Sequence, residues 1–440
     1  MKRSTRFFAL ILSVFFVASP RVALASETDA LLNKLVEKKL LTAEEAQEVR
    51  NDMAKESGPA AKMAEADTKD VVKKMPGGSW LDTVKWGGDL RLRHETQFRD
   101  PQITRNRERF RLRYGFKATP TPPLEIGVLM GTGTSGDPIS NNQTFTNTFD
   151  KKAIFIDKAY AKYTPWSWVS AIGGKMDNPF LYTDMVWDPD TTPEGVALQL
   201  KSPQTIPVLR EWLPVRPFGN FGAFPLNELN TTKGHPAVYG AQGGADIDLP
   251  FFGMSFQPSV GYYDYQGIKN QVVTNVTSAS AGAAGNTTFS SGGTRFAYDY
   301  NIVDFLGRLT LPDVVGQPVV FTGDYAMNIA KSPTANSSVP DEMDNIGAWQ
   351  AGVEVGKVTE KFGSLKGFYF FKHLEQNAVF GPLTDSDFGG GGTNHFGHIF
   401  GVQMGLNKWA SVGLKYFRVD EIIGTQTHND TLQADLQFKF

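Results

Sequence analysis

The chain has 440 residues, a formal net charge of −2, 44 glycines and no cysteine. The absence of cysteine excludes a disulfide-stapled scaffold, a thiolate metal site and a cysteine nucleophile. Charged residues make up 20% of the sequence and form no basic block, so we expect no nucleic-acid partner. The glycine content and an aromatic share of 12% favour strands and turns over helices.

The chain begins with the layout of a secretory signal peptide. Lys2, Arg3 and Arg6 form a basic start. An apolar run then covers residues 7–17, and small residues near position 25 suit a signal peptidase. The apolar run is too short to span a bilayer as a helix. We therefore expect residues 1–25 to be cleaved and the protein to be exported.

Residues 26–78 predict a helical or coiled segment followed by a linker. Leucines recur at helical spacing in residues 31–41, and Thr42 with Glu45 fits a capping box at the start of a second helix. Proline and glycine at 76–78 mark the end of this segment. We expect a periplasmic spacer, and a short oligomerising coiled coil is the alternative.

From residue 79 to residue 440 the hydrophobic pattern has a period of two. Segments such as 347–357 and 432–440 place apolar side chains on one face and small or polar side chains on the other. Strands of about ten residues with one apolar face are what a transmembrane barrel requires. A soluble sandwich shows similar alternation, so the pattern alone does not separate the two folds.

The connections between the predicted strands favour the barrel, because short and long connections tend to alternate. Bacterial outer-membrane barrels have short periplasmic turns, long outer loops and an even number of strands. We predict an all-β fold, a transmembrane antiparallel β-barrel of 16 strands, with 14 or 18 as alternatives. The predicted strands are 84–98, 105–118, 123–133, 153–165, 168–176, 193–201, 207–217, 237–249, 251–265, 299–311, 318–330, 347–357, 363–374, 397–407, 410–420 and 430–440.

Several motifs together resemble the Putative porin family of Gram-negative bacteria. They are GDLRLRHE (88–95), RERFRLRYGF (107–116), GGKMDNPF (173–180), DSDFGGGGTNH (385–395) and the helical stretch 31–49. The resemblance implies an outer-membrane porin with a water-filled channel for passive diffusion of small hydrophilic solutes and ions. It implies contact with membrane lipid and lipopolysaccharide, and no cofactor.

The resemblance leaves selectivity and assembly open. The helical stretch is also similar to phosphate-selective porins, so an anion- or phosphate-selective channel is an alternative, and a homotrimer stays open. The last strand carries Phe438 and ends in Phe440. This ending resembles the signal that the barrel-assembly machinery recognises.

Basic side chains share one face of the first two predicted strands. An arginine that faces lipid near the bilayer midplane costs roughly 2–4 kcal/mol, so this face should point into the lumen. Like charges on neighbouring strands repel, so we expect compensation by water, by Asp89 and Glu95, or by acids reaching across the pore. The predicted pore-lining residues are Arg91, Arg93, Arg109, Arg111, Arg113 and Lys117.

The long connection 177–192 is a candidate source of such acids. By analogy with general porins, we expect it to fold into the barrel opposite the arginines and to narrow the channel. An ordinary solvated outer loop is the alternative. The constriction candidates are Asp177, Asp184, Asp188 and Asp190.

Catalytic and metal sites have little support. His395 and His398 lie near Asp385 and Asp387, but no regular element fixes these positions, so we expect a flexible polar loop and no metal site. The sequence has no G-x-S-x-G nucleophile elbow, so we expect no enzyme and no catalytic residue. The segment 266–298 is rich in small polar residues, and we expect a mobile outer loop that buries no core. A non-conducting surface adhesion or structural barrel is the remaining alternative.

Overall fold

The computed structural model describes residue 42 and most of residues 80–440. The exceptions within that range are 101, 206–212, 230–233, 251, 278–281, 332–338, 341–342 and 425–427. The predicted signal peptide and nearly all of the predicted helical segment 26–78 lie outside the described residues, so both stay predictions. Within the described part of the chain, no helix combines the length and the apolar character that crossing a membrane would need.

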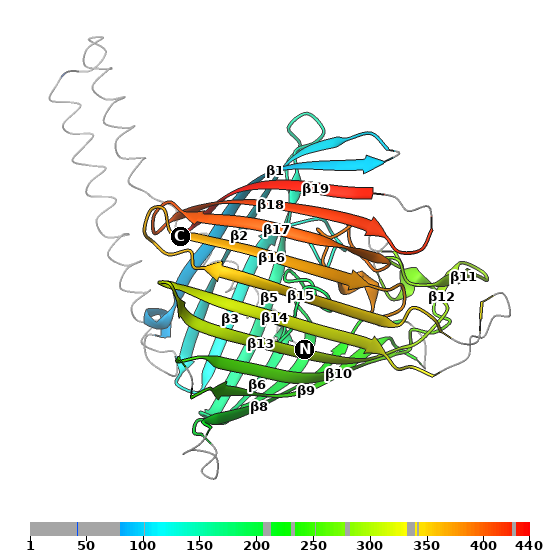
Figure 1. Ribbon diagram of the computed structural model, residues 1–440. Coiled ribbons are helices and arrows are strands. Elements are labelled where there is room, and N and C mark those ends of the chain that lie inside the picture. The colour runs from blue at the N-terminus through cyan, green and yellow to red at the C-terminus, as the bar shows by residue number, and fades with distance from the viewer. Residues whose placement is uncertain are drawn as a thin grey trace. The chain divides into compact units, whose positions relative to one another are not determined.

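Across the described residues, sixteen long antiparallel strands form one closed barrel (Figure 1). The barrel closes because β1 pairs with β2 on one side and with β19 on the other. The barrel strands are β1 (Lys85–Asp100), β2 (Arg105–Thr121), β3 (Leu124–Thr132), β5 (Ile154–Trp166), β6 (Val169–Lys175), β7 (Glu194–Lys201), β8 (Val215–Pro225), β9 (Ala237–Asp248), β10 (Ser255–Gln266), β13 (Tyr300–Val314), β14 (Gln317–Asn328), β15 (Gly347–Gly356), β16 (Leu365–Leu374), β17 (His395–Gly405), β18 (Ala410–Glu421) and β19 (His428–Lys439).

Several short elements lie outside the barrel strands. The two-residue strand β4 (Gln143–Thr144) pairs with β2, and β11 (Thr288–Ser290) pairs with β12 (Thr294–Phe296) in a separate small sheet. The single-turn 3₁₀ helices are η1 (Trp80–Thr83), η2 (Val273–Asn275) and η3 (Gly381–Leu383).

The predicted strand number is confirmed, but one predicted strand is misplaced. The prediction of a strand at 207–217 is wrong, because the strand in this region is β8, Val215–Pro225. Its alternation is hard to recognise, because the aromatic Phe224 lies on the inner face, 2% exposed, where it packs against Phe180. The outer face mixes small residues such as Gly219 with the aromatic Phe221, which is 45% exposed, so apolar side chains lie on both faces and the hydrophobic contrast is weak.

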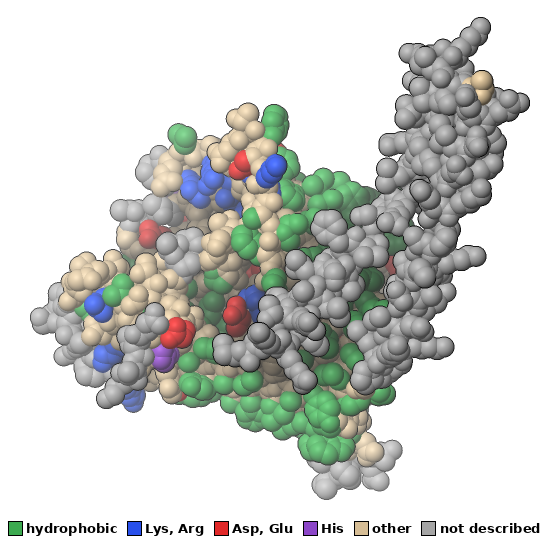
Figure 2. All heavy atoms as spheres, turned by 180° about the vertical axis from the view of Figure 1, so that it is seen from behind, with side chains coloured by type: hydrophobic (Ala, Val, Ile, Leu, Met, Phe, Trp, Pro, Cys, Tyr) green, Lys and Arg blue, Asp and Glu red, His purple; other side chains and the backbone are tan. Residues whose placement is uncertain are grey.

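The two faces of the barrel wall differ in polarity. On β14 and β15, Phe321, Tyr325 and Trp349 are 43–47% exposed and point outward, whereas Asp324 and Gln350 are 4–5% exposed and point inward. Figure 2 shows hydrophobic side chains gathered over the outer wall, with charged and polar side chains gathered at one end. An apolar outer belt is what contact with lipid tails requires.

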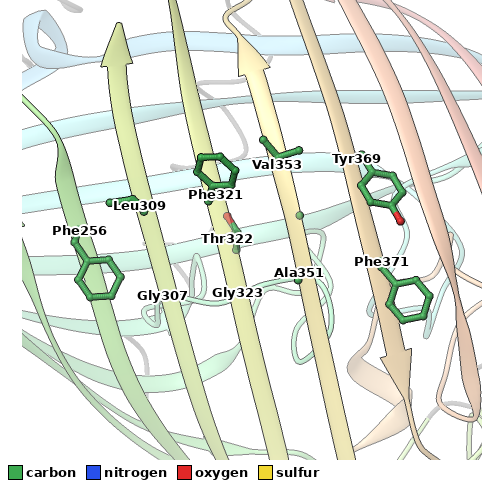
Figure 3. A pocket seen from close by; sticks show the side chains of 11 residues that line it. Phe256, Gly307, Leu309, Phe321, Thr322, Gly323, Ala351, Val353, Tyr369 and Phe371 are labelled. Atoms are coloured by element: carbon green, nitrogen blue, oxygen red, sulfur yellow. The ribbon is translucent and has the colours of Figure 1, made fainter. Parts of the chain in front are cut away.

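One hollow of the described surface lies on this outer wall. It has a volume of about 640 Å³ and spans β10 to β16 (Figure 3). Gly307, Gly323 and Ala351 are neighbours across the strands at its floor, and aromatic rings such as Phe256 and Phe371 stand around it. Its apolar lining fits lipid chains better than hydrophilic solutes, so the solute site has to be sought inside the barrel.

An apolar core fills part of the barrel interior. It joins side chains of three long connections to the inner faces of the strands. Phe180 and Trp187 of the β6–β7 connection pack edge-on against Tyr263 of β10, with ring centroids 5.1 and 5.6 Å away. Phe380 of the β16–β17 connection packs against Tyr265 with ring centroids 4.9 Å apart.

The expectation that 266–298 buries no core is wrong for its described residues. Ile268 and Phe296 are 0% exposed, and both belong to the interior core. The segment has too few apolar residues to form a core alone. Its buried apolar side chains pack instead against the barrel wall and against the other inward connections.

The close approach of Gly352 to β16 yields a stability prediction. A Cβ at Gly352 would overlap the Phe370 ring and lie 2.5 Å from the Tyr369 carbonyl oxygen, so we expect Gly352→Ala to destabilise the barrel by about 1–3 kcal/mol. Gly323→Ala on the neighbouring strand is the matched control, because no atom lies within 4 Å of a Cβ there. Denaturant unfolding of the detergent-folded proteins measures both, and equal stability of the two variants would refute the prediction.

Candidate pore constriction

The basic residues of β1 and β2 lie on the inner face of the barrel wall. In β1, Leu92 is 40% exposed and its neighbour Arg93 is 3% exposed, as the alternation of a strand requires. The pairing register sets Arg91 opposite Arg111, and Arg93 opposite Arg109. Four guanidinium groups therefore occupy two successive cross-strand pairs, an arrangement that is repulsive unless acids compensate it.

Two acids of β1 lie among these arginines. Asp89 accepts hydrogen bonds from Arg111 at 2.9 Å and from Arg113 at 2.8 Å. Glu95 is 1% exposed; it forms ion pairs with Arg107 and, at 3.3 Å, with Arg109. Lys117, the last of the predicted basic residues, lies at the end of β2 opposite Lys85, is exposed, and takes no part in this cluster.

Arg93 lies between two carboxylates that come from different parts of the chain. Its Nε and Nη2 donate to the two oxygens of Asp435 on β19, at 2.7 and 2.9 Å. Its Nη1 donates to Asp387 of the β16–β17 connection at 3.0 Å. The forked contact with Asp435 is the geometry in which a guanidinium binds a carboxylate most strongly.

The β6–β7 connection crosses the interior of the barrel, and several strands hold it there. Leu181 exchanges two hydrogen bonds with the side chain of Gln242 on β9, at 2.7 and 2.6 Å. Arg308 of β13 donates to the Tyr182 carbonyl oxygen at 2.8 Å. Thr183 donates to Asp324 of β14.

Two of the four acids predicted in this connection form ion pairs with the inner wall. Asp190 accepts a hydrogen bond from Arg111 at 3.2 Å and lies 3.7 Å from Arg113. Asp184 pairs with Lys372 of β16 at 2.7 Å. The connection therefore joins the basic face of β2 to β16, which lies five strands away around the barrel.

The other two predicted acids lie elsewhere. Asp177 pairs with Lys158 at the start of the connection, and its side chain is 64% exposed. Asp188 is buried, and its carboxylate accepts hydrogen bonds from the backbone N–H groups of Asp190 at 2.7 Å and of Ser386 at 2.8 Å. Within the described part of the chain, neither of these two acids forms an ion pair with the arginines of β1 and β2.

Sequence reasoning missed a second inward connection, between β16 and β17. The expectation of a flexible polar loop there is wrong, because Phe380 is 2% exposed and Asp385 is 9% exposed. The Asp188 N–H donates to the Leu383 carbonyl oxygen at 2.7 Å, and the Asp385 N–H donates to that of Asp184 at 3.1 Å, so the two connections are bonded to each other. The glycine-rich motif 385–395 was visible in the sequence, but nothing in it indicated burial.

The contact between the two connections perturbs the ionisation of their acids. Burial raises the pKa of Asp385 to about 6, although Lys372 acts in the opposite direction. Burial, with the nearby Asp385 and Asp190, raises the pKa of Asp188 well above its usual value. Burial likewise acts to raise the pKa of Asp387, but Arg93 and Lys415 outweigh it and hold that pKa below its usual value. Asp385, which changes charge near neutral pH, therefore lies close to Asp387, which stays charged.

The described residues contain no group of three or more histidine, aspartate or glutamate side chains arranged to hold a metal ion. His395 and His398 lie an odd number of positions apart on β17, so their side chains point to opposite faces of the sheet. The Nδ1 of His398 lies 2.9 Å from the hydroxyl group of Tyr369.

A closed antiparallel barrel with an apolar outer wall, a charged inner wall and an inward-folded connection defines the class of outer-membrane channel proteins. The chain belongs to the Putative porin family, whose pattern matches residues 97–294 and 286–440. No curated protein matches the sequence.

Solved structures of similar fold are also porins. OprB of Pseudomonas putida superposes with a TM-score of 0.52 at 9% identity, over 82% of this chain and 95% of that chain. OmpF of Salmonella typhi has a TM-score of 0.47 at 13% identity, over 81% and 97% of the respective chains. At 9% identity the superposition with OprB establishes the fold alone.

The buried Lys372 yields a second prediction. Its side chain is 1% exposed and lies near both Asp184 and Asp385. Lys372→Met removes a buried cation and leaves the carboxylates of Asp184, 30% exposed, and Asp385, 12% exposed, without it, so we expect a loss of about 3 kcal/mol of unfolding free energy. Lys366→Met on the same strand is the control, because its pair with Glu354 is about 30% exposed and should be worth only about 0–1 kcal/mol. Denaturant unfolding compares the variants, and a Lys372→Met protein as stable as Lys366→Met would contradict the assignment.

Proposed function

We propose that this outer-membrane channel passes small hydrophilic solutes and ions by passive diffusion. In this proposal the β6–β7 connection, held across the barrel by Asp190 and Asp184, constricts the pore. That connection is the observation that carries the proposal, because it sets acids opposite the basic inner face of β1 and β2. A pore lined by opposed charges selects solutes by size, charge and dipole.

The residues proposed to line the pore are the inner-face arginines at positions 91, 93, 109, 111 and 113. Most of them bind acids, and such neutralised groups contribute little net field. Arg91 is an exception, because its Nη2 donates to the amide oxygen of Asn142 at 2.7 Å instead of to an acid. We therefore propose a weak preference for anions at the arginine face, set by local charge and not by the overall net charge.

A second candidate function is a non-conducting surface barrel. It is favoured by the apolar core that three connections build inside the barrel. Single-channel recording in a planar bilayer separates the two candidates. A diffusion channel gives stable ohmic current steps, whereas a correctly folded barrel that gives no current would favour the second candidate.

Lipopolysaccharide contact, recognition by the barrel-assembly machinery through Phe438 and Phe440, and a homotrimer stay predictions of the sequence. Phe440 exchanges backbone hydrogen bonds with Gly88 at 2.9 and 3.1 Å, so the last residue extends the closing pair of strands. Its ring is 54% exposed and lies 6.2 Å from that of Tyr114.

Neutralising part of the basic face should change ion preference. In a variant that combines Arg91→Ser, Arg109→Ser and Arg111→Ser, we expect the reversal potential in a potassium chloride gradient to shift toward cation preference, because Asp89, Glu95 and Asp190 lose part of their compensation. Arg216→Ser is the matched control, since that arginine pairs with Asp248 away from this face. An unchanged reversal potential in the triple variant would remove these arginines from the selectivity mechanism.

The raised pKa values of the loop acids predict a pH dependence. As the pH falls from 7.5 to 5, Asp385 takes up a proton around its pKa of about 6. The constriction then carries less negative charge, so anion preference should rise. Reversal potentials measured across this range test the expectation. In Asp385→Asn the part of the change centred near pH 6 should vanish, and a profile identical to that of the original protein would show that another group titrates.

A further inference from the structure

A cavity of about 320 Å³ lies at the end of the arginine face where the long connections emerge. Arg99, near the end of β1, and Arg107 and Arg109 of β2 line it. Gly390–Gly392 of the β16–β17 connection and Asp137 of the β3–β5 connection also contribute. The cavity is therefore separate from the contacts of Asp184 and Asp190 that hold the constriction.

The cationic groups at this cavity outnumber the acids that contact them. Arg107 and Arg109 share one carboxylate, that of Glu95. Arg99 donates from Nη2 to the neutral amide oxygen of Gln97 at 2.7 Å. Asp137 is the one acid among the lining residues; burial raises its pKa and so favours its neutral form. Even with Glu95 and Asp137 both ionised, three arginines leave an excess of positive charge.

Two of these arginines also have an N–H donor without a hydrogen-bond partner among the described residues. Among the described residues, the Nε atoms of Arg99 and Arg109 are buried from solvent and have no hydrogen-bond partner. A buried donor without a partner is costly, so a shift of either guanidinium group that brings its Nε–H to a bound acceptor is favourable. Guanidinium groups present paired N–H donors whose spacing matches the oxygens of carboxylate and phosphate groups.

The glycine-rich wall suits a bound anion for a second reason. Gly390, Gly391 and Gly392 have φ angles of 90°, 95° and 89°, a backbone conformation that side chains disfavour. These residues present only backbone atoms to the cavity, so a solute can approach the main chain closely. The Gly391 N–H already donates to the Phe388 carbonyl oxygen at 3.0 Å, so this wall contributes close access and the guanidinium groups supply the donors.

We propose that this cavity binds the oxyanion group, carboxylate or phosphate, of a small solute before it reaches the constriction. The proposal deepens the proposed channel function, on which its transport role rests. Binding itself does not depend on conduction. The excess of positive charge disfavours a cation, and the volume accommodates a small organic acid or a phosphate-bearing solute.

Binding can be measured without any current. The refolded full-length chain in detergent is titrated by calorimetry with inorganic phosphate and, separately, with acetate at constant ionic strength. We expect saturable binding of at least one anion, and the comparison of the two arms distinguishes the oxyanion. Arg99→Gln should weaken binding by about tenfold or more, because it removes a charge-assisted donor. Arg99→Lys should retain part of the affinity, since it keeps the positive charge but loses the paired N–H donors of the guanidinium group.

Arg216→Gln is the control, and its binding should match that of the original protein. If Arg99→Gln fails to fold, Arg109→Gln replaces it in the same comparison. Absence of saturable binding of both anions, or equal affinity in the original protein and the arginine variant, would overturn the proposal. Potassium chloride currents recorded from the same preparations separate anion binding from conduction. A protein that conducts but binds no anion refutes only the proposed anion site. A protein that binds an anion but gives no current refutes only the proposed channel function.

Discussion

A sheet inside a bilayer has no water to satisfy its backbone, so each strand must find two neighbours, and the pairing of β1 with β19 supplies the last one. The other features depend on this closure. A closed wall has one face for lipid and one for the interior, and the period of two sorts the side chains between them. The arginines of β1 and β2 cannot face lipid, so they are brought together inside, directly opposite one another.

That concentration of charge explains why the long connections fold inward. Glu95 and Asp89 do not compensate all the arginines, and a buried charge without a partner costs several kcal/mol. Asp190 and Asp387 come from two different connections and bind Arg111 and Arg93. The same connections bring Phe180, Trp187 and Phe380 into the interior core. Electrostatic compensation and apolar burial therefore hold the connections in one place, and the constriction is a consequence of both.

Much of the barrel was predictable from the sequence, because alternation is a local property. It gave the strand number, and it placed Arg93 and Arg111 on the inner face. It failed at β8, where aromatic side chains lie on both faces, Phe224 inside and Phe221 outside. It also failed for 266–298 and 375–394, because apolar residues such as Ile268 and Phe380 pack against distant strands and have no periodic neighbours. Which arginine Asp190 binds, and that Asp184 binds Lys372 instead, follows from the path of the connection across the barrel, which no sequence spacing encodes.

The most direct test of this account is a cross-link across the interior. The chain contains no cysteine, so introduced cysteines are the only thiols that can react. A variant carrying Thr183→Cys and Asp324→Cys replaces two side chains that are bonded to each other, and a short bifunctional thiol reagent can join them. We predict rapid cross-linking in the folded barrel with little change in single-channel conductance, because the connection already lies against β14. Failure to cross-link, or a large fall in conductance when the link forms, would show that the connection normally lies elsewhere and would contradict the account.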